Sequence, residues 1–311
     1  MKILTPDRNL YAFLALCVIW GATWIGIKAG IETVPPLFFA GTRFTCAGLI
    51  FIFLLGKSES VFSVALRDWP RLFLVSLMMI TFCYGPLFWG MLYIDSGTAA
   101  VLELTLTPIA LLGFALLFGQ ESFDPVRLCA IGLGVFGICI LFAPDILAAH
   151  ESGLGTGSFK TLLGGAAVAS AAITYALGSV LARPLLNKYS AMIISGVTTL
   201  FGGIALVAAS FLFEDHTVDA LTGQWGMNAW LGWLFLVLFG SCIGYQIYLR
   251  LLKDIGASAA GSYAFVSPIV AVLLGAAVYG EAITITKVLG MMVMLLAAYF
   301  VIAYKKPSQP Q

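Results

Sequence analysis

Hydrophobic residues are grouped along the chain into long runs that short polar breaks separate. A run of about 20 apolar residues can cross the hydrocarbon core of a membrane as an α-helix. The pattern predicts ten such helices, whose ends are marked by charged and turn-forming residues. We expect them at residues 10–30, 36–56, 70–93, 96–118, 126–144, 161–182, 190–213, 229–250, 257–279 and 284–304.

The composition supports lipid as the solvent of this chain. Of its 311 residues, 61% are hydrophobic and only 10% are charged, whereas about a quarter of the residues of a typical soluble protein are charged. Ten membrane-crossing helices with short loops use almost the whole length, so no room remains for a sizeable soluble domain. The prediction is an all-α polytopic membrane protein.

Several function classes lack the residues they need. The net charge of +1 does not suit a nucleic-acid partner, which usually binds a basic stripe. The two histidines, His150 and His216, lie in polar connections, so neither a metal site nor Ser-His-Asp catalysis is expected within the membrane. The chain also has no Walker-type glycine loop for ATP. We therefore expect no enzymatic activity, no cofactor and no metal.

The distribution of lysine and arginine predicts the orientation. With a cytoplasmic N-terminus, three basic residues fall outside, Lys28, Lys160 and Lys287, and one, Arg43, lies within a helix. Twelve fall on the cytoplasmic side: Lys2, Arg8, Lys57, Arg67, Arg71, Arg127, Arg183, Lys188, Arg250, Lys253, Lys305 and Lys306. Because basic residues favour the cytoplasmic face, both termini are predicted there. The expected location is the inner (cytoplasmic) membrane, as a multi-pass protein.

The two halves of the sequence resemble each other over four helices. Shifts of 155 to 160 residues align an ordered series of pairs: Gly41 with Gly196, Gly48 with Gly203, Gly85 with Gly244, Asp95 with Asp254, Gly97 with Gly256, Pro108 with Pro268, and Glu121 with Glu281. Such an ordered series indicates an internal repeat. With five helices each, the halves enter the membrane from opposite sides, an inverted repeat typical of alternating-access carriers. We expect repeats at 1–145 and 161–311, joined by a polar extracytoplasmic linker at 146–160.

Several motifs resemble the drug/metabolite transporter superfamily, in its branch with two EamA-type domains. They are Trp20-Gly21-Ala22-Thr23-Trp24 followed by Lys28, then Thr42-Arg43-Phe44, and a proline followed by a glycine and a glutamate in each half, Pro108 to Glu121 and Pro268 to Glu281. The resemblance implies ten helices in two inverted repeats and export or exchange of small organic solutes, often amino acids. It also implies a central cavity lined by the first, third and fourth helices of each half. The second half departs from the pattern at Thr198, which replaces the arginine.

Two ionisable residues lie deep within predicted helices, Arg43 and Glu103. Such residues are functional candidates because a charge in the membrane is costly. Counted from Pro36 and Ser96, each is seven positions into its helix, a depth of about 10 Å on the same side. Two interpretations stay open: a zwitterionic solute held by both, or a buried ion pair that fixes helix packing. Glu103 could also exchange a proton during transport, since a low dielectric favours its neutral form.

Aromatic residues and one amide supply further candidates for the substrate site. They fall on helices that the resemblance places around the cavity: Trp20, Trp24, Tyr84, Phe88, Trp89, Tyr175, Tyr245, Gln246 and Tyr263. An apolar cavity with a few hydroxyls suits an amphipathic or aromatic solute. Packing is the alternative role for each of them taken singly.

Prolines and interfacial charges complete the candidate set. Pro86, Pro108 and Pro268 lie inside predicted helices, where they remove a backbone donor and could act as hinges. Glu121 and Glu281 lie at helix ends, where a structural role as a cap or as the partner of a base is favoured.

The sequence thus predicts a secondary transporter that exports or exchanges small metabolites, most of all amino acids, by alternating access. An uptake carrier or a multidrug exporter of the same fold and a channel are the alternatives. The expected partners are a small-molecule substrate and the lipid bilayer. Because the chain holds both halves, it should act as a monomer, and a dimer stays open.

Overall fold

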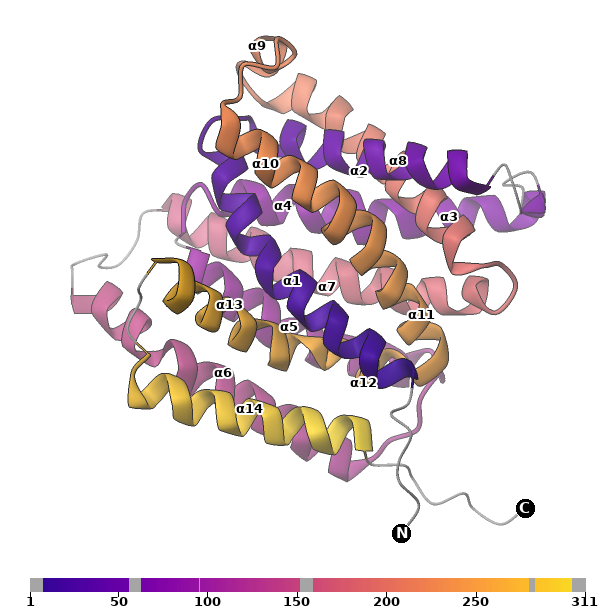
Figure 1. Cartoon of the computed structure of the whole chain (residues 1–311). Helices are drawn as coiled ribbons and strands as arrows, with labels where there is room; N and C mark the ends of the chain where they lie inside the picture. The colour runs from indigo at the N-terminus through magenta and orange to yellow at the C-terminus, as the bar shows by residue number, and fades with distance from the viewer. Residues whose placement is uncertain (1–7, 56–62, 95, 152–158, 280–282, 304–311) are drawn as a thin grey trace.

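The computed structural model describes residues 8–55, 63–94, 96–151, 159–279 and 283–303 (Figure 1). Within these ranges all regular secondary structure is helical and there is no strand. In the first half the elements are α1 (Arg8–Ile31), α2 (Pro36–Leu55), η2 (Leu66–Asp68), α3 (Trp69–Ser76), η3 (Leu77–Thr81), α4 (Phe82–Gly90), α5 (Ser96–Leu117) and α6 (Pro125–Glu151).

The second half has a similar series with one extra short helix in a loop. Its elements are α7 (Phe159–Leu186), α8 (Ala191–Phe213), α9 (Thr217–Ala220), α10 (Met227–Phe235), η4 (Leu236–Gly244), α11 (Tyr245–Ile255), α12 (Ala257–Gly261), α13 (Tyr263–Tyr279) and α14 (Ile285–Ala303).

The described helices confirm a polytopic all-α membrane protein. Seven are long and apolar enough to cross a membrane, at Arg8–Ile31, Pro36–Leu54, Leu66–Gly90, Lys160–Leu186, Ala191–Phe213, Met227–Ile255 and Ala257–Leu274. Three further apolar helices are shorter, at Leu102–Leu117, Pro125–Ile140 and Ile285–Val301. The number of crossings and the side of the termini stay predictions.

Some expected boundaries differ from the observed helix ends. The helix α6 continues to Glu151, so the first residues of the expected linker are helical. The helix α7 continues past residue 182 to Leu186 and includes Pro184. Several residues named in the sequence analysis lie outside the described residues: Lys2, Lys57, Asp95, Glu281, Lys305 and Lys306.

The third helix of each half contains a π-helical segment. In the first half η3 joins α3 to α4, and in the second half η4 joins α10 to α11. The shift of 159 residues that aligns the repeats places the start of η3, Leu77, on the start of η4, Leu236. The internal repeat therefore extends to a local irregularity of the backbone, and π-helical turns often occur at functional sites.

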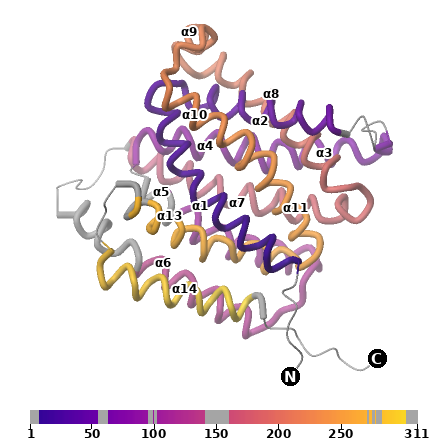
Figure 2. The backbone as a smooth tube through the Cα atoms, in the orientation of Figure 1, coloured from indigo at the N-terminus to yellow at the C-terminus, as the bar shows by residue number. Residues whose placement is uncertain are grey.

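Contacts between helices pair equivalent elements of the two halves. The helices α2 and α8 pack against each other, as do α6 and α14, which lie together at one edge of the bundle (Figure 2). The contact of α5 with α7 has its counterpart in that of α13 with α1, and the contact of α4 with α7 has its counterpart in those of α10 and α11 with α1. This pattern is what two halves related by an approximate two-fold axis produce.

Glycines bring the backbones of α2 and α8 into direct contact. A Cβ atom added to Gly48 would lie 2.5 Å from the backbone nitrogen of Leu200, and one added to Gly203 would overlap the backbone nitrogen of Thr45. Small residues are what allow such close approach of helices within a membrane. Gly48 and Gly203 occupy equivalent positions in the repeat, so each half contributes the same glycine to this contact.

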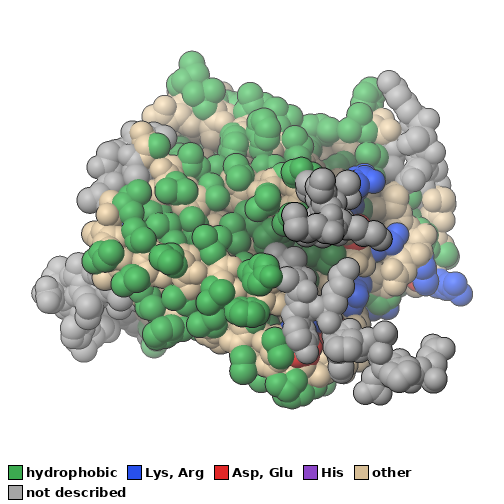
Figure 3. Space-filling view, turned by 60° about the horizontal axis from the view of Figure 1, so that its bottom comes forward, with side chains coloured by type: hydrophobic (Ala, Val, Ile, Leu, Met, Phe, Trp, Pro, Cys, Tyr) green, Lys and Arg blue, Asp and Glu red, His purple; other side chains and the backbone are tan. Residues whose placement is uncertain are grey.

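Basic side chains gather at one end of the bundle (Figure 3). Two of these basic side chains contact residues that are distant in sequence. Lys188 pairs with Asp68 at 3.1 Å, and Arg71 donates to the carbonyl of Leu181 at 3.0 Å. At another loop, Glu214 accepts hydrogen bonds from the first backbone amides of α2, and a carboxylate is favourable at a helix N-terminus.

The α2–α8 seam predicts a sharp effect of a single methyl group. Gly203→Ala should lower the free energy of unfolding by about 1–3 kcal/mol because its Cβ meets backbone atoms that cannot rotate away. Thermal unfolding of the purified protein in detergent measures the change as a lower Tm. Gly113→Ala is the control, since a Cβ there has nothing within 4 Å and Tm should stay or rise slightly. Equal Tm values for the two variants would contradict the close seam.

Candidate functional site

A cavity lies between the two halves of the bundle. Its wall comes from α1, α2, α4 and α5 of the first half and from α7, η4, α11 and α13 of the second. The lining residues are Trp20, Thr23, Trp24, Ile27, Arg43, Phe44, Cys83, Tyr84, Leu87, Glu103, Leu104, Tyr175, Gly240, Ser241, Tyr245, Tyr263 and Ser267. Its volume is about 60 Å³, well below the roughly 300–1,000 Å³ of typical ligand pockets. A solute of amino-acid size therefore requires the walls to move.

Arg43 is held in this wall by aromatic rings. Its side chain on α2 is 2% exposed. The guanidinium carbon lies 4.3 Å from the ring centre of Phe44, 4.9 Å from that of Tyr84 and 5.3 Å from that of Phe88. The negative faces of the rings stabilise the cation. They supply no acceptor of the strength of a carboxylate, and the Nε atom of Arg43 has no hydrogen-bond partner among the described residues.

Glu103 on α5 lines the same cavity but does not form an ion pair with Arg43. Each of the two residues is seven positions after the first residue of its helix, Pro36 for α2 and Ser96 for α5. The two ionisable side chains, one basic and one acidic, thus share one cavity without an ion pair between them. The structure thus shows no ion pair between them, and the zwitterion-binding interpretation stays a prediction.

Trp20 is the centre of an aromatic cluster beside the charges. Its ring centre is 4.6 Å from that of Tyr263 and 6.4 Å from that of Tyr175, both in edge-to-face geometry. Tyr248, which does not line the cavity, packs against Trp20 at 5.2 Å. The indole Nε1 donates to the carbonyl of Gly240 at 3.3 Å, so a residue of the first half is tied to η4 of the second.

The tyrosine hydroxyls behind this cluster are bonded within the protein. Tyr248 donates to Ser179 Oγ at 2.8 Å, and the hydroxyl of Tyr245 lies 3.1 Å from Thr198 Oγ1. Thr198 occupies the position in the second half that Arg43 occupies in the first. It serves as a buried partner of a tyrosine, and the two halves therefore use this position differently.

Three of the expected site residues lie next to the cavity without lining it. Phe88 is fully buried beneath Arg43, and the ring of Trp89 packs on Tyr93 at 4.8 Å. Gln246 accepts a hydrogen bond from Ser195 at 2.8 Å. Their helical spacing was compatible with the cavity, but the rotation of each helix directs them to packing contacts.

The structure adds residues that sequence reasoning missed. These lining residues are Thr23, Ile27, Phe44, Cys83, Leu87, Leu104, Gly240, Ser241 and Ser267. Some carried a usable signal, since Thr23 and Ile27 follow Trp20 at helical spacings of three and seven. Ser241 and Ser267 carried none, because a single serine in an apolar helix more often bonds its own backbone.

Carbonyls freed by prolines are bonded to the opposite half. Pro86 leaves the carbonyl of Phe82, four residues earlier, without its helical donor, and this oxygen accepts from Thr174 Oγ1 on α7 at 2.9 Å. Pro108 and Pro268 are buried inside α5 and α13.

Pro184 in α7 is a fourth interior proline, missed because the predicted helix stopped two residues before it. It frees the carbonyl of Val180, which accepts from Gln120 Nε2 at 2.8 Å. The next carbonyl, of Leu181, accepts from Arg71. Both donors belong to the first half, so the segment of α7 around Pro184 is a point of contact between the halves.

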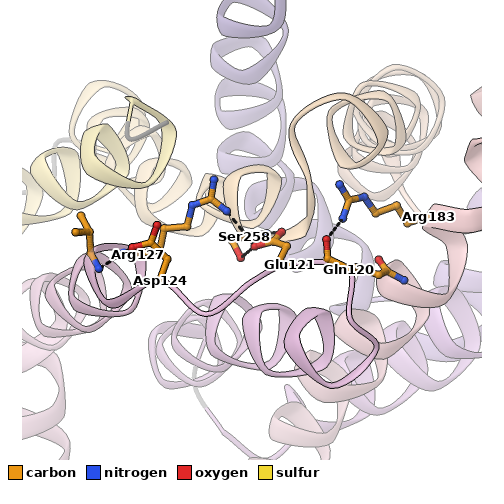
Figure 4. Close-up of polar contacts among 7 residues, drawn as sticks. Gln120, Glu121, Asp124, Arg127, Arg183 and Ser258 are labelled. Atoms are coloured by element: carbon orange, nitrogen blue, oxygen red, sulfur yellow. Dashed lines mark hydrogen bonds and ion pairs between the residues drawn. The ribbon is translucent and has the colours of Figure 1, made fainter. Parts of the chain in front are cut away.

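The loop between α5 and α6 joins the second half at the basic end of the bundle, through contacts that we call the loop latch (Figure 4). Glu121 accepts from the backbone nitrogen of Ser258 at 3.0 Å and from its hydroxyl at 2.5 Å, and pairs with Arg127 at 3.2 Å. Arg183 Nη1 donates to the carbonyl of Gln120 at 3.0 Å. Glu121 therefore binds a base, as its position suggested, and caps α12 of the other half rather than its own following turn.

Comparison with known proteins agrees with this architecture. The EamA-like transporter family matches residues 9–143 and 162–303. The inner membrane transporter YedA of Escherichia coli K12 is 31% identical over 303 residues, which cover 96% of this chain and 92% of YedA. The transporter YoaV of Bacillus subtilis 168 is 24% identical, with 91% of this chain and 92% of YoaV covered.

The fold also has a counterpart among solved structures. A crystal structure of another protein superposes with a TM-score of 0.76 at 17% identity, over 96% of this chain and 98% of that chain. At this identity the likeness concerns the fold alone. The sequence matches, by contrast, confirm the resemblance drawn from the motifs. With both halves matched and a relative 31% identical across nearly its whole length, the chain belongs to the EamA-like transporter family.

Proposed function

We propose that this membrane transporter exports or exchanges small organic metabolites, above all amino acids, across the cytoplasmic membrane by alternating access. The observation that carries the proposal is the pair of opposite charges that share one cavity without forming an ion pair. Charged residues inside a membrane usually pair with one another. Where they do not, a solute that carries both a negative and a positive group can pair with each residue.

An α-amino acid fits this requirement. Its carboxylate can accept charge-assisted hydrogen bonds from Arg43, and its ammonium group can donate to Glu103. The aromatic rings around Trp20 offer an apolar surface to the rest of the molecule. A solute that carries only one charge would leave the other residue unpaired, which is the physical basis for preferring zwitterions over general multidrug substrates.

Alternating access is supported by the contacts at the basic end of the bundle. Basic residues favour the cytoplasmic side, so the loop latch is assigned to that side. It ties the first half to α7 and α12. A solute can leave towards the cytoplasm only after these contacts separate, and two inverted halves offer a symmetry-related way to do so.

The proposal includes the topology expected from sequence. Ten crossings, both termini in the cytoplasm, repeats at 1–145 and 161–311 and a linker at 146–160 on the outer side are mutually consistent with the charge distribution. The name of YedA, an inner membrane transporter, supports the inner membrane as the location. Exchange driven by substrate on the opposite side, which a channel does not show, is the kinetic test of a carrier.

Removal of either cavity charge should impair amino-acid transport. We expect Arg43→Gln and Glu103→Gln to weaken the apparent affinity about 10- to 100-fold, the effect of losing one charge-assisted hydrogen bond of about 1.5–3 kcal/mol. Counterflow of labelled amino acids in proteoliposomes measures this. Lys28→Gln is the control, because Lys28 is exposed near the end of α1. An amine that lacks the carboxylate should bind the wild type more weakly than the matching amino acid does. In Arg43→Gln the amine and the amino acid should bind about equally.

A charge exchange separates substrate contact from packing. If the two residues only fix helix packing, the double variant Arg43→Glu/Glu103→Arg should regain transport. If they hold a zwitterion, the double variant should fold but stay inactive, because the altered side-chain lengths displace both charges. Recovery of wild-type counterflow by the double variant would refute the proposed site.

Weakening the loop latch should open the cavity towards the cytoplasm. In a variant whose only cysteine is Cys83, which lines the cavity and is 3% exposed, Glu121→Gln should raise labelling by an impermeant thiol reagent about tenfold. The reason is that the amide binds Ser258 and Arg127 more weakly, by about 1.5 kcal/mol or more. Inside-out vesicles present the cytoplasmic face to the reagent.

Glu214→Gln is the matched control for this experiment, since Glu214 caps α2 away from the latch. Its labelling rate should equal that of the parent. An unchanged rate in Glu121→Gln, or an equal rise in both variants, would contradict a latch that acts at the cytoplasmic end.

A further inference from the structure

Several buried polar groups without a partner belong to the cavity wall. Among the described residues, nine buried side-chain atoms lack a hydrogen-bond partner. Four of these atoms belong to residues that line the cavity: Arg43 Nε, the hydroxyl of Tyr175, Ser241 Oγ and Ser267 Oγ. Because Arg43 already has a role in the proposed function, the three hydroxyls are the unexplained members.

Other buried hydroxyls close to the cavity are bonded within the protein. Tyr245 and Tyr248 lie in the same part of the bundle and are bonded to Thr198 and Ser179. Most buried polar groups in proteins find a partner, and among the described residues outside the cavity wall Thr45, Thr105 and Thr107 also lack one. Tyr175, Ser241 and Ser267 are at most 2% exposed, and their hydroxyls have no hydrogen-bond partner among the described residues. Leaving them unbonded is costly unless a bound solute completes them.

The three hydroxyls come from three helices of the second half that meet around Trp20. The ring of Tyr175 on α7 contacts the indole, and Ser241 follows Gly240, whose carbonyl accepts from the indole. The carbonyl of Ser267 on α13 lies against Gly21, the next residue after Trp20, closely enough that a Cβ there would be 2.6 Å away. The charges that suit an amino acid's two ionic groups come instead from the first half.

This division of the wall separates two tasks. If Arg43 and Glu103 bind the carboxylate and the ammonium group, the remaining polar groups face the rest of the solute. The second half contributes hydroxyls to the cavity wall but no charged side chain. A hydroxyl both donates and accepts, so it matches a neutral hydroxyl or amide. A charged side chain would need a counter-ion that this part of the wall does not supply.

We infer that Tyr175, Ser241 and Ser267 form a hydroxyl set that selects amino acids with a neutral hydrogen-bonding side chain over their aliphatic isosteres. The inference rests on the proposed function and deepens it by naming the substrate class. A site that hydrogen-bonds a substrate group rejects the analogue that lacks it, because its own polar groups then stay unpaired.

Matched pairs of solutes test the hydroxyl set. Threonine against valine and asparagine against leucine differ in polarity at similar size. In proteoliposome counterflow, the wild type should prefer the polar member of each pair at least tenfold. Ser241→Ala, Ser267→Ala and Tyr175→Phe should each reduce this preference at least threefold. A Tm in detergent equal to that of the wild type shows that each variant is folded.

Ser170→Ala is the matched control. Ser170 lies on α7, is exposed and bonds the carbonyl of Ala167 in its own helix. Its variant should keep the full preference for the polar solute. A loss as large as that in Ser241→Ala would overturn the assignment.

The outcomes also separate this inference from the proposed function. Valine counterflow as fast as threonine counterflow in the wild type would overturn the hydroxyl set and leave an amino-acid carrier intact. Absence of counterflow with every amino acid would overturn both. A preference for threonine that survives in all three variants would show that other groups read the side chain, and so would overturn the assignment of these residues.

Discussion

The structure is organised by the cost of leaving a polar group unpaired where no water can reach it. In the hydrocarbon layer an unsatisfied backbone or side-chain group costs several kcal/mol, so helices that bond their own backbone are the natural spanning elements. The ion pairs Asp68–Lys188 and Glu121–Arg127 lie at loops and helix ends. Arg43 and Glu103 are ionisable residues within helices that form no ion pair with each other, and both line the cavity.

The same cost explains how kinks become contacts between halves. A proline inside a helix frees a carbonyl, and in lipid that carbonyl needs a new donor. Thr174 supplies one to the carbonyl freed by Pro86, and Gln120 supplies one to that freed by Pro184. In both cases the donor belongs to the opposite half. Any movement of one half against the other must therefore exchange these bonds, which couples helix geometry to transport.

Glycine packing works in the opposite sense, by fixing what does not move. The seam of α2 with α8 brings backbones together at Gly48 and Gly203, where even a methyl group would meet backbone atoms. Packing at this density resists deformation. The seam thus offers a firm contact between the halves, while the cavity and the loop latch lie where side chains, rather than backbones, meet.

The amino-acid sequence by itself determined the helical class, the repeat, the family and the two cavity charges, because apolar runs, charge positions and ordered motifs are local or periodic signals. Only the tertiary structure decided that Arg43 and Glu103 form no ion pair with each other, that Glu121 binds Ser258 137 residues away, and that Ser241 and Ser267 line the cavity while Gln246 does not. These outcomes depend on how each helix is rotated about its axis and on contacts between distant segments. A serine or glutamine in an apolar run gives the same sequence pattern whether its side chain points to the cavity or away from it. Packing against the other half determines which direction the side chain takes.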